Sequence, residues 1–200
     1  MQVTIRLEAG YDMALYGMSL SFKDRAIPPE SWWDMNPLSA RFIPGASVRK
    51  HKISERAKQN ANLGLGHNKF RRQIMLWIDI EAPRFWWSEF DTYKVGTVAQ
   101  SESTMHTLKK RDITEADFEN GCAPMSFDIK NFNSVRETLP IEVLKAELPE
   151  SYLQRRLVAL NYEVLSCMIT QRKKHRLSQW LYFIEEIYRQ AQHPELLPSK

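Results

Sequence analysis

The sequence has few cysteines and few glycines, and it has no long apolar run. Cys122 and Cys167 are its only cysteines and form no pair motif, so two reduced thiols are expected rather than a disulfide framework. The longest apolar stretch, residues 74–80, is the length of one strand and contains Asp79, which argues against a transmembrane helix. The N-terminus lacks the basic start and following apolar run of a secretory signal, so the cytoplasm is the expected compartment.

The usual catalytic and metal-binding motifs are also missing. The five histidines are scattered without metal-ligand spacing, so no metal site is expected. The stretch NLGLGH at residues 62–67 lacks the Lys-Ser/Thr of a P-loop and the third glycine of a dinucleotide-binding turn. The net charge of +4 suits an anionic ligand, but it equally suits ordinary solvated lysines. Binding of nucleic acid through residues 49–57 and 171–176 is the weakest hypothesis, because no aromatic platform interrupts these basic runs.

Length and periodicity predict one α+β domain over residues 1–200. The chain is 43% hydrophobic and 26% charged, as in ordinary globular proteins. Apolar residues alternate with polar ones at Val3, Ile5 and Leu7, which predicts a strand, and residues 74–80 alternate in the same way. Four prolines predict an irregular loop over residues 23–46, and its two tryptophans are expected to cover either core or ligand.

The rest of the chain is predicted to be mainly helical, around a small mixed or antiparallel sheet. Residues 113–120 are predicted to form a helix with Asp112 as its N-cap. Apolar side chains recur at helical spacing over residues 153–169 and again over 177–188, which predicts a helical C-terminal half. Shorter helices are expected over residues 11–17, 47–61 and 84–91.

The segment 85–94 (FWWSEFDTYK) contains five aromatic residues and two carboxylates. Such a cluster could line a base-stacking pocket, but clusters of this kind more often belong to a core or a subunit interface. Glu89 and Asp91 could read a purine amino group or an amidine. They could equally pair with Arg84 or Lys94, and the sequence leaves these alternatives open.

Four segments of the chain, in order, resemble the flavin-dependent thymidylate synthases. Residues 18–22 (MSLSF) are similar to that family's Arg-Val-Ser-Phe stretch, and residues 81–85 (EAPRF) to its strand and Ala-Pro-x-Phe turn. Residues 92–105 fall on the family signature Arg-His-Arg-x-x-Ser-x-Asn-Glu-x-Ser-x-Arg-Tyr. The C-terminal pattern of the family is matched at Leu148-Pro149, Asn161, Arg172 and Gln179-Trp180.

The resemblance implies a homotetramer whose active site lies between subunits and holds flavin (FAD) and deoxyuridylate. Lys145 falls where the family has an arginine for the uridylate phosphate, and Arg172 falls where an arginine contacts the pyrimidine. Ser21, Asn161 and Tyr93 fall at positions that imply cofactor binding. The aligned signature adds four candidate nucleotide-binding residues, namely Lys94, Gln100, Ser101 and Ser103.

The signature itself is largely missing, and two functional hypotheses therefore remain. Lys94 alone keeps a positive charge in the Arg-His-Arg position, and lysine cannot make the bidentate fork of arginine. Glu102 replaces the serine near the uracil, where a carboxylate would repel phosphate. One hypothesis is an enzyme of the family type, in which standard thymidylate synthesis is doubtful. The alternative is a protein that sequesters or senses a nucleotide on the same scaffold. Neither hypothesis involves a membrane.

Overall fold

The computed structural model describes residues 1–22, 46–64 and 66–199. Most of the predicted irregular loop at 23–46 lies outside the described residues, and its last residue, Ala46, begins helix α2. The four strands are β1 (Gln2–Ala9), β2 (Met75–Pro83), β3 (Thr97–Ser101) and β4 (Leu153–Asn161). The longer helices are α1 (Tyr11–Ser19), α2 (Ala46–Ala61), α7 (Tyr162–Arg172) and α8 (Ser178–Gln190). Shorter helices are α3 (Arg84–Phe90), α4 (Thr104–Thr107), α5 (Ile129–Val135) and α6 (Ile141–Glu147).

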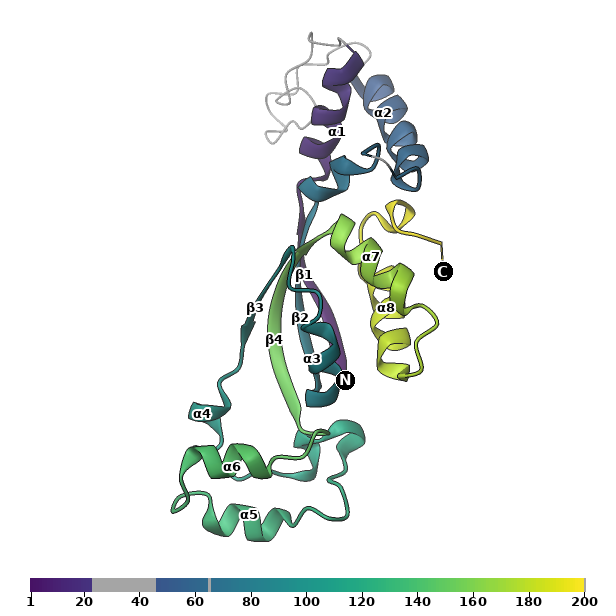
Figure 1. The fold of residues 1–200 in the computed structure, drawn as a ribbon. Helices are drawn as coiled ribbons and strands as arrows, with labels where there is room; N and C mark the ends of the chain where they lie inside the picture. Colours follow the sequence, from purple (N-terminus) through teal and green to yellow (C-terminus); the bar gives the residue numbers. More distant parts are fainter. Residues whose placement is uncertain (23–45, 65, 200) are drawn as a thin grey trace.

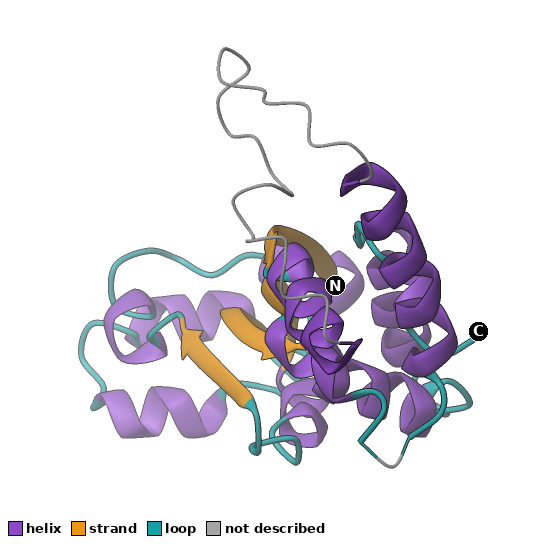
Figure 2. Cartoon of the chain, turned by 90° about the horizontal axis from the view of Figure 1, so that it is seen from above, coloured by secondary structure: helices purple, strands orange, loops and turns teal. Residues whose placement is uncertain are grey.

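The four strands form one antiparallel sheet in the order β1-β2-β4-β3. The predicted α+β class and the two predicted strands are therefore confirmed. Figure 2, the view from above, shows how much of the chain outside the sheet is helical. Helices α3, α7 and α8 lie on the same side of the sheet in Figure 1. Because strand side chains alternate, this arrangement buries every second residue of β2, namely Leu76, Ile78, Ile80 and Ala82.

A second hydrophobic cluster lies at the end of the sheet opposite α1 and α2, around α5 and α6 (Figure 1). Its buried residues are Leu108, Ile113, Phe118, Phe132, Leu144, Leu148 and Tyr152. They come from residues 108–152, which interrupt the sheet between β3 and β4. This part of the chain carries Lys145, so the packing of the cluster positions one of the predicted binding residues.

Two predictions of secondary structure are wrong. Residues 153–161 form strand β4 and not the start of a helix, because hydrogen bonds to β2 and β3 override a leucine spacing that also fits a helical period. The helix begins only at Tyr162, after the Asn161 cap. Residues 113–120 contain two short 3-10 turns, Glu115–Asp117 and Glu119–Gly121, and no α-helix. Thr114 caps the first turn in place of Asp112, and the positive φ of Asn120 (62°) breaks the helical path.

Candidate functional site

Arg172, the last residue of α7, is held by groups from three other parts of the chain. Its Nε donates to Tyr93 Oη at 2.9 Å, and its Nη1 donates to Glu89 Oε2 at 2.9 Å. Its guanidinium carbon lies 4.9 Å from the centre of the Trp180 ring and 5.5 Å from that of Tyr93. The structure therefore brings together two residues predicted from the sequence, Tyr93 and Arg172. Cation–π contacts with the two rings and two hydrogen bonds, one to a phenol and one to a carboxylate, fix the orientation of the guanidinium.

Glu89 organises this cluster through a single carboxylate oxygen. Trp180 Nε1 donates to Glu89 Oε2 at 2.9 Å, and His175 Nε2 lies 3.3 Å from the same oxygen. His175 Nδ1 accepts from the backbone N–H of Leu177 at 3.2 Å, which places the ring proton of a neutral His175 on Nε2. Glu89 and Asp91 therefore pair with neither Arg84 nor Lys94, the two partners that the sequence left open. Glu89 pairs with Arg172, and Asp91 pairs with Arg156 at 2.8 Å.

Sequence reasoning missed Glu89 as the partner of Arg172, and His175 as a second group beside Glu89. Glu89 lies 83 residues from Arg172 along the chain, and no periodicity connects a short helix after β2 with the end of α7. The two segments meet because both pack on the same face of the sheet (Figure 1). A local signal for this contact is therefore missing from the sequence.

Lys145 lies outside the Arg172 cluster, beside a cavity of about 210 Å³ near the end of the sheet opposite α1. The cavity is lined by Arg84, Thr104, Lys145, Leu148, Tyr152 and Gln154. Arg84 Nη1 donates to the backbone oxygen of Leu148 at 2.5 Å, which holds the guanidinium at the cavity wall. Burial raises the pKa of the Tyr152 phenol to about 12, so this side chain is neutral at physiological pH. Two cations, two hydroxyls and an amide thus surround one small space, and Arg84 also pairs with Glu150 at 3.5 Å.

The other candidate residues of the aligned signature come after α3 in the chain, in the turn before β3, on the edge strand β3 and at the start of α4. Lys94 is exposed in the turn between α3 and β3, and Gln100 and Ser101 are exposed on β3. Ser103 is the N-cap residue of α4, and its backbone oxygen accepts from the N–H groups of His106 and Thr107. The next residue after Ser103, Thr104, lines the Lys145 cavity. Ser103 and Lys145 are therefore close to the same space.

Asn161 and Ser21 lie apart from these groups. Asn161 caps α7, and its side-chain oxygen accepts from the backbone N–H of Val164 at 3.0 Å. This is the capping role that an asparagine before a helix often has, and it leaves the Nδ2 donors for other partners. Asn161 and Arg172 lie at opposite ends of α7, about 16 Å apart along its axis. Ser21 is exposed in the turn Leu20–Phe22 after α1, at the end of the molecule opposite α6 (Figure 1).

The aromatic segment after β2 belongs mainly to the core. Trp86, Trp87 and Phe90 are at most 2% exposed. Trp86 and Phe90 pack with Trp180 and Phe183 of α8, and Trp87 packs against Trp86 and Phe90. The alternative of a base-stacking pocket is therefore wrong for these three residues. Tyr93 is only partly buried, so it is the aromatic side chain of the segment that contributes to the Arg172 cluster.

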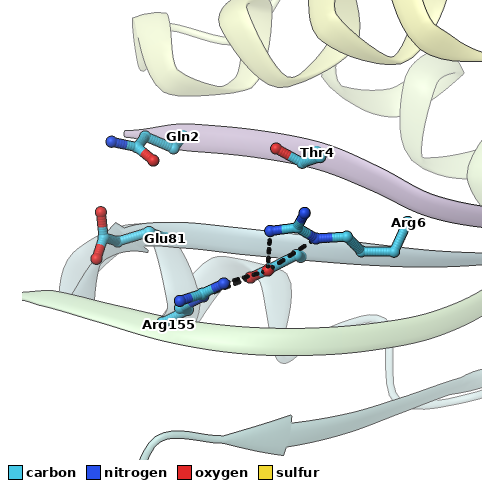
Figure 3. Close-up of a pocket in the computed structure, with 6 residues that line it drawn as sticks. Gln2, Thr4, Arg6, Glu81 and Arg155 are labelled. Carbon is cyan, nitrogen blue, oxygen red and sulfur yellow. Dashed lines mark hydrogen bonds and ion pairs between the residues drawn. The ribbon is translucent and has the colours of Figure 1, made fainter.

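A third polar cluster lies on the face of the sheet opposite the core. Asp79 of β2 accepts from Arg6 Nε and Nη2 at 3.1 and 2.8 Å, and from Arg155 Nε and Nη2 at 2.8 and 2.5 Å. Figure 3 shows the two arginines reaching the carboxylate from strands on either side, beside a cavity of about 110 Å³. The hydrogen bond from Arg155 has the largest effect on the pKa of Asp79, burial opposes it, and the hydrogen bond from Arg6 lowers the pKa further, so that it falls from 3.8 to about 2.

This lowered pKa predicts a contribution to stability that depends on pH. The folded pKa of Asp79 lies below the unfolded value, so the contribution is present above about pH 4. It is lost as the pH falls toward about 2 and the carboxylate is protonated in both states. We expect the free energy of unfolding to fall more steeply between pH 5 and pH 2.5 for the wild type than for Asp79→Asn. Urea titrations across this range measure the difference, and parallel curves for the two proteins would contradict it.

Metal ligands do not gather in the described part of the chain. No group of three or more His, Cys, Asp or Glu side chains there could hold a metal ion. Among the same residues, no helix is both long and apolar enough to cross a membrane.

Comparison with known proteins gives matches at the level of structure and not of sequence. No family model and no curated protein matches the chain. A structure of thymidylate synthase X from Helicobacter pylori with FAD and dUMP superposes with a TM-score of 0.70 at 14% identity, over 98% of this chain and 97% of that one. A second structure, the flavin-dependent thymidylate synthase ThyX of the same organism with FAD and dUMP, gives the same TM-score and identity over 98% of both chains. The chain therefore shares its fold, from end to end, with the flavin-dependent thymidylate synthase ThyX.

Proposed function

We propose that this protein binds a nucleotide of the deoxyuridylate or flavin type at a site completed between subunits. The observation that carries the proposal is the cavity between Lys145, Arg84 and Tyr152, whose two cations suit a phosphate group. The proposal is supported by the fold, because the ThyX structures that superpose on the whole chain were solved with FAD and dUMP.

The proposed site needs more than one chain. The resemblance to the family places Lys145 and Arg172 around one uridylate, yet in this chain they lie on separate elements, α6 and the end of α7 (Figure 1). A second subunit would therefore supply one of the two residues to each site. We propose a homo-oligomer, with the tetramer of the family as the expected form.

The side chains suit a uridylate better than they suit a flavin. FAD would carry reducing equivalents if it bound, and Ser21, Tyr93 and Asn161 are the residues proposed to contact it. Its pyrophosphate carries two negative charges, while the aligned signature offers only Lys94 as a cation and adds the exposed Glu102. The Asn161 side-chain oxygen is also already engaged in the helix cap. No redox step is therefore assigned to these residues.

Substitutions at Lys145 and Arg172 test the binding proposal. We expect Lys145→Ala and Arg172→Ala each to weaken nucleotide binding by about tenfold or more, because losing a charge-assisted contact costs roughly 1.5–3 kcal/mol. Isothermal calorimetry with dUMP, dTMP, FMN, FAD and the common nucleoside monophosphates measures the affinities.

Matched controls are Lys130→Ala on α5 and Arg176→Ala after α7, which remove exposed cations outside the two clusters. They should leave the affinity unchanged. Equal affinity of the wild type and the two site variants would show that the site is assigned to the wrong residues. Failure of every ligand to bind would overturn the proposal as a whole.

A protein that sequesters or senses a nucleotide without turnover is the second candidate function. The pairing of Arg172 with Glu89 favours it, because this contact neutralises a charge that the family-type reaction would use on the base. The colour of the purified protein and the nucleotide released on denaturation distinguish the two. Yellow protein that releases flavin supports the enzyme, and colourless protein that releases another nucleotide supports the binding protein.

A further inference from the structure

Three residues that line the Lys145 cavity have hydrogen-bonding groups that the described part of the chain leaves unused. Tyr152 is only 5% exposed, yet its hydroxyl forms no hydrogen bond with any described residue. The hydroxyl of Thr104 and the Nζ of Lys145 have no side-chain or backbone partner there either. Leaving a donor unpaired on a mostly buried side chain costs free energy, so the Tyr152 hydroxyl at a cavity wall points to a ligand.

Arg84 contributes a cation that the chain itself holds only on one side. Its Nη1 is bound to the backbone oxygen of Leu148, and Glu150 lies 3.5 Å from its Nη2. The side chain of Glu150 is 64% exposed, so solvent weakens this ion pair. The Nε and Nη2 of Arg84 make no hydrogen bond within the part of the chain that the structure describes. They are therefore available to an anion in the cavity.

The acceptors around the cavity are mostly engaged. The side-chain oxygen of Gln154 accepts from Nε and Nη2 of Arg156 at 3.2 and 3.0 Å, and the backbone oxygen of Leu148 accepts from Arg84. The remaining groups are two cations, which only donate, and two hydroxyls, which can donate. A terminal phosphate is the complement of this set, because it carries a charge of about −1.5 to −2 at neutral pH and three acceptor oxygens.

Position 104 connects the cavity with the missing signature. In the alignment of residues 92–105, Thr104 stands where the signature has its last arginine. Thr104 and Arg84 line the same small space, although they belong to different helices, α4 and α3. The guanidinium that is absent from one wall of the cavity is therefore present on another.

We propose that Arg84 and Tyr152 determine which phosphate the cavity accepts, and that Arg84 supplies from α3 the charge that the aligned signature has lost at position 104. Together with Lys145 they select a terminal phosphate monoester. An internal phosphate, such as each phosphate in FAD, offers only two unesterified oxygens and one charge, so it leaves a donor of the cavity unpaired. The inference rests on the proposed function and deepens it, because it names the class of phosphate and the residues that read it.

A matched pair of ligands tests the class of phosphate. dUMP and its phosphate monomethyl ester share base and sugar, and they differ only in one phosphate oxygen. We expect isothermal calorimetry to show that the wild type binds dUMP at least about tenfold more tightly than the ester, the effect of one lost charge-assisted contact. Tyr152→Phe keeps the ring in the second hydrophobic cluster and should weaken dUMP binding by about tenfold, with a smaller effect on the ester.

Tyr182→Phe is the control for the tyrosine variant. It removes the same hydroxyl from a position on α8 that is 40% exposed and does not line the cavity, so the affinity for both ligands should stay unchanged. The ratio of the two affinities separates ligand contact from a structural role, because general loosening of the cluster weakens both ligands alike.

Moving the guanidinium to position 104 tests the role of Arg84. Arg84→Ala should weaken dUMP binding by about tenfold or more, and adding Thr104→Arg should restore most of the affinity, because the charge returns to the same cavity. Loss of the bond to Leu148 is not repaired in this way, so recovery identifies a ligand contact. Arg84→Gln, whose amide can still donate to Leu148, covers the case in which Arg84→Ala fails to fold.

Lys145→Ala distinguishes failure of this inference from failure of the proposed function. If Lys145→Ala loses dUMP affinity while Tyr152→Phe and the two Arg84 variants keep it, a nucleotide binds at the cavity but these residues do not read its phosphate. Equal affinity of the wild type for dUMP and its methyl ester would overturn the inference in the same way. Failure of dUMP to bind would overturn it even if another ligand bound, and failure of every ligand would remove the proposed function as well.

Discussion

Replacement of Trp86 by alanine is expected to lower the free energy of unfolding by about 3–5 kcal/mol, as for other large aromatic residues removed from a core. Trp86 has no exposed surface, and its ring centre lies 4.8 Å from that of Trp180, 5.0 Å from Trp87 and 5.1 Å from Phe90. Truncation leaves a cavity in the layer that joins α3 to α8. Urea unfolding followed by circular dichroism measures the change.

Trp86→Phe provides the matched comparison. The indole Nε1 of Trp86 is buried and has no hydrogen-bond partner among the described residues, so phenylalanine removes an unsatisfied donor together with part of the ring. We therefore expect this variant to lose clearly less stability than Trp86→Ala. A loss below about 1 kcal/mol for Trp86→Ala would show that this position is not closely packed. Because Trp180 also holds Glu89, Trp86→Ala should weaken nucleotide binding as well.

Standard thymidylate synthesis is expected to be at least about 10²-fold slower than in active flavin-dependent thymidylate synthases. Loss of an arginine fork that orients the reacting groups can alone have an effect of this size. The structure adds a second reason, because the arginines near the aligned signature are already paired. Arg172 is bound to Glu89, Arg156 to Asp91, and, further along the chain, Arg111 to Asp117. The charge of each of these three arginines is therefore already balanced by a carboxylate of the same chain.

The deciding assay combines the protein with FAD, a reduced nicotinamide, methylene-tetrahydrofolate and tritiated dUMP, and follows tritium release from the base. An active flavin-dependent thymidylate synthase in the same mixture is the positive control. Turnover of about 0.1–10 per second, within the usual range for enzymes, would refute this prediction and support the enzyme. Absent turnover, together with tight binding of a nucleotide, would support the binding protein.

Local patterns in the sequence determined the strands β1 and β2, the helix α8 and the α+β class. In each case the spacing of apolar residues along the chain, every second residue in a strand or every three to four in a helix, decides the outcome. Alternation along β2 puts Leu76, Ile78 and Ile80 on one face, and helical spacing along α8 puts Trp180, Ile184 and Ile187 on another. The same reasoning indicated that the aromatic segment after β2 more often forms core. The resemblance to the flavin-dependent thymidylate synthases selected Tyr93 and Arg172 as candidates, although it could not show that they touch.

Only the tertiary structure decided the secondary structure of β4 and the partners of the charged residues. The leucines of residues 153–161 fit a helix as well as a strand, and hydrogen bonds to β2 and β3 settle the choice, because a strand between two neighbours satisfies its backbone on both sides. The pairing of Glu89 with Arg172, and of Asp79 with two arginines, joins residues more than 70 positions apart. Such contacts follow from the packing of whole elements, and no local period records them.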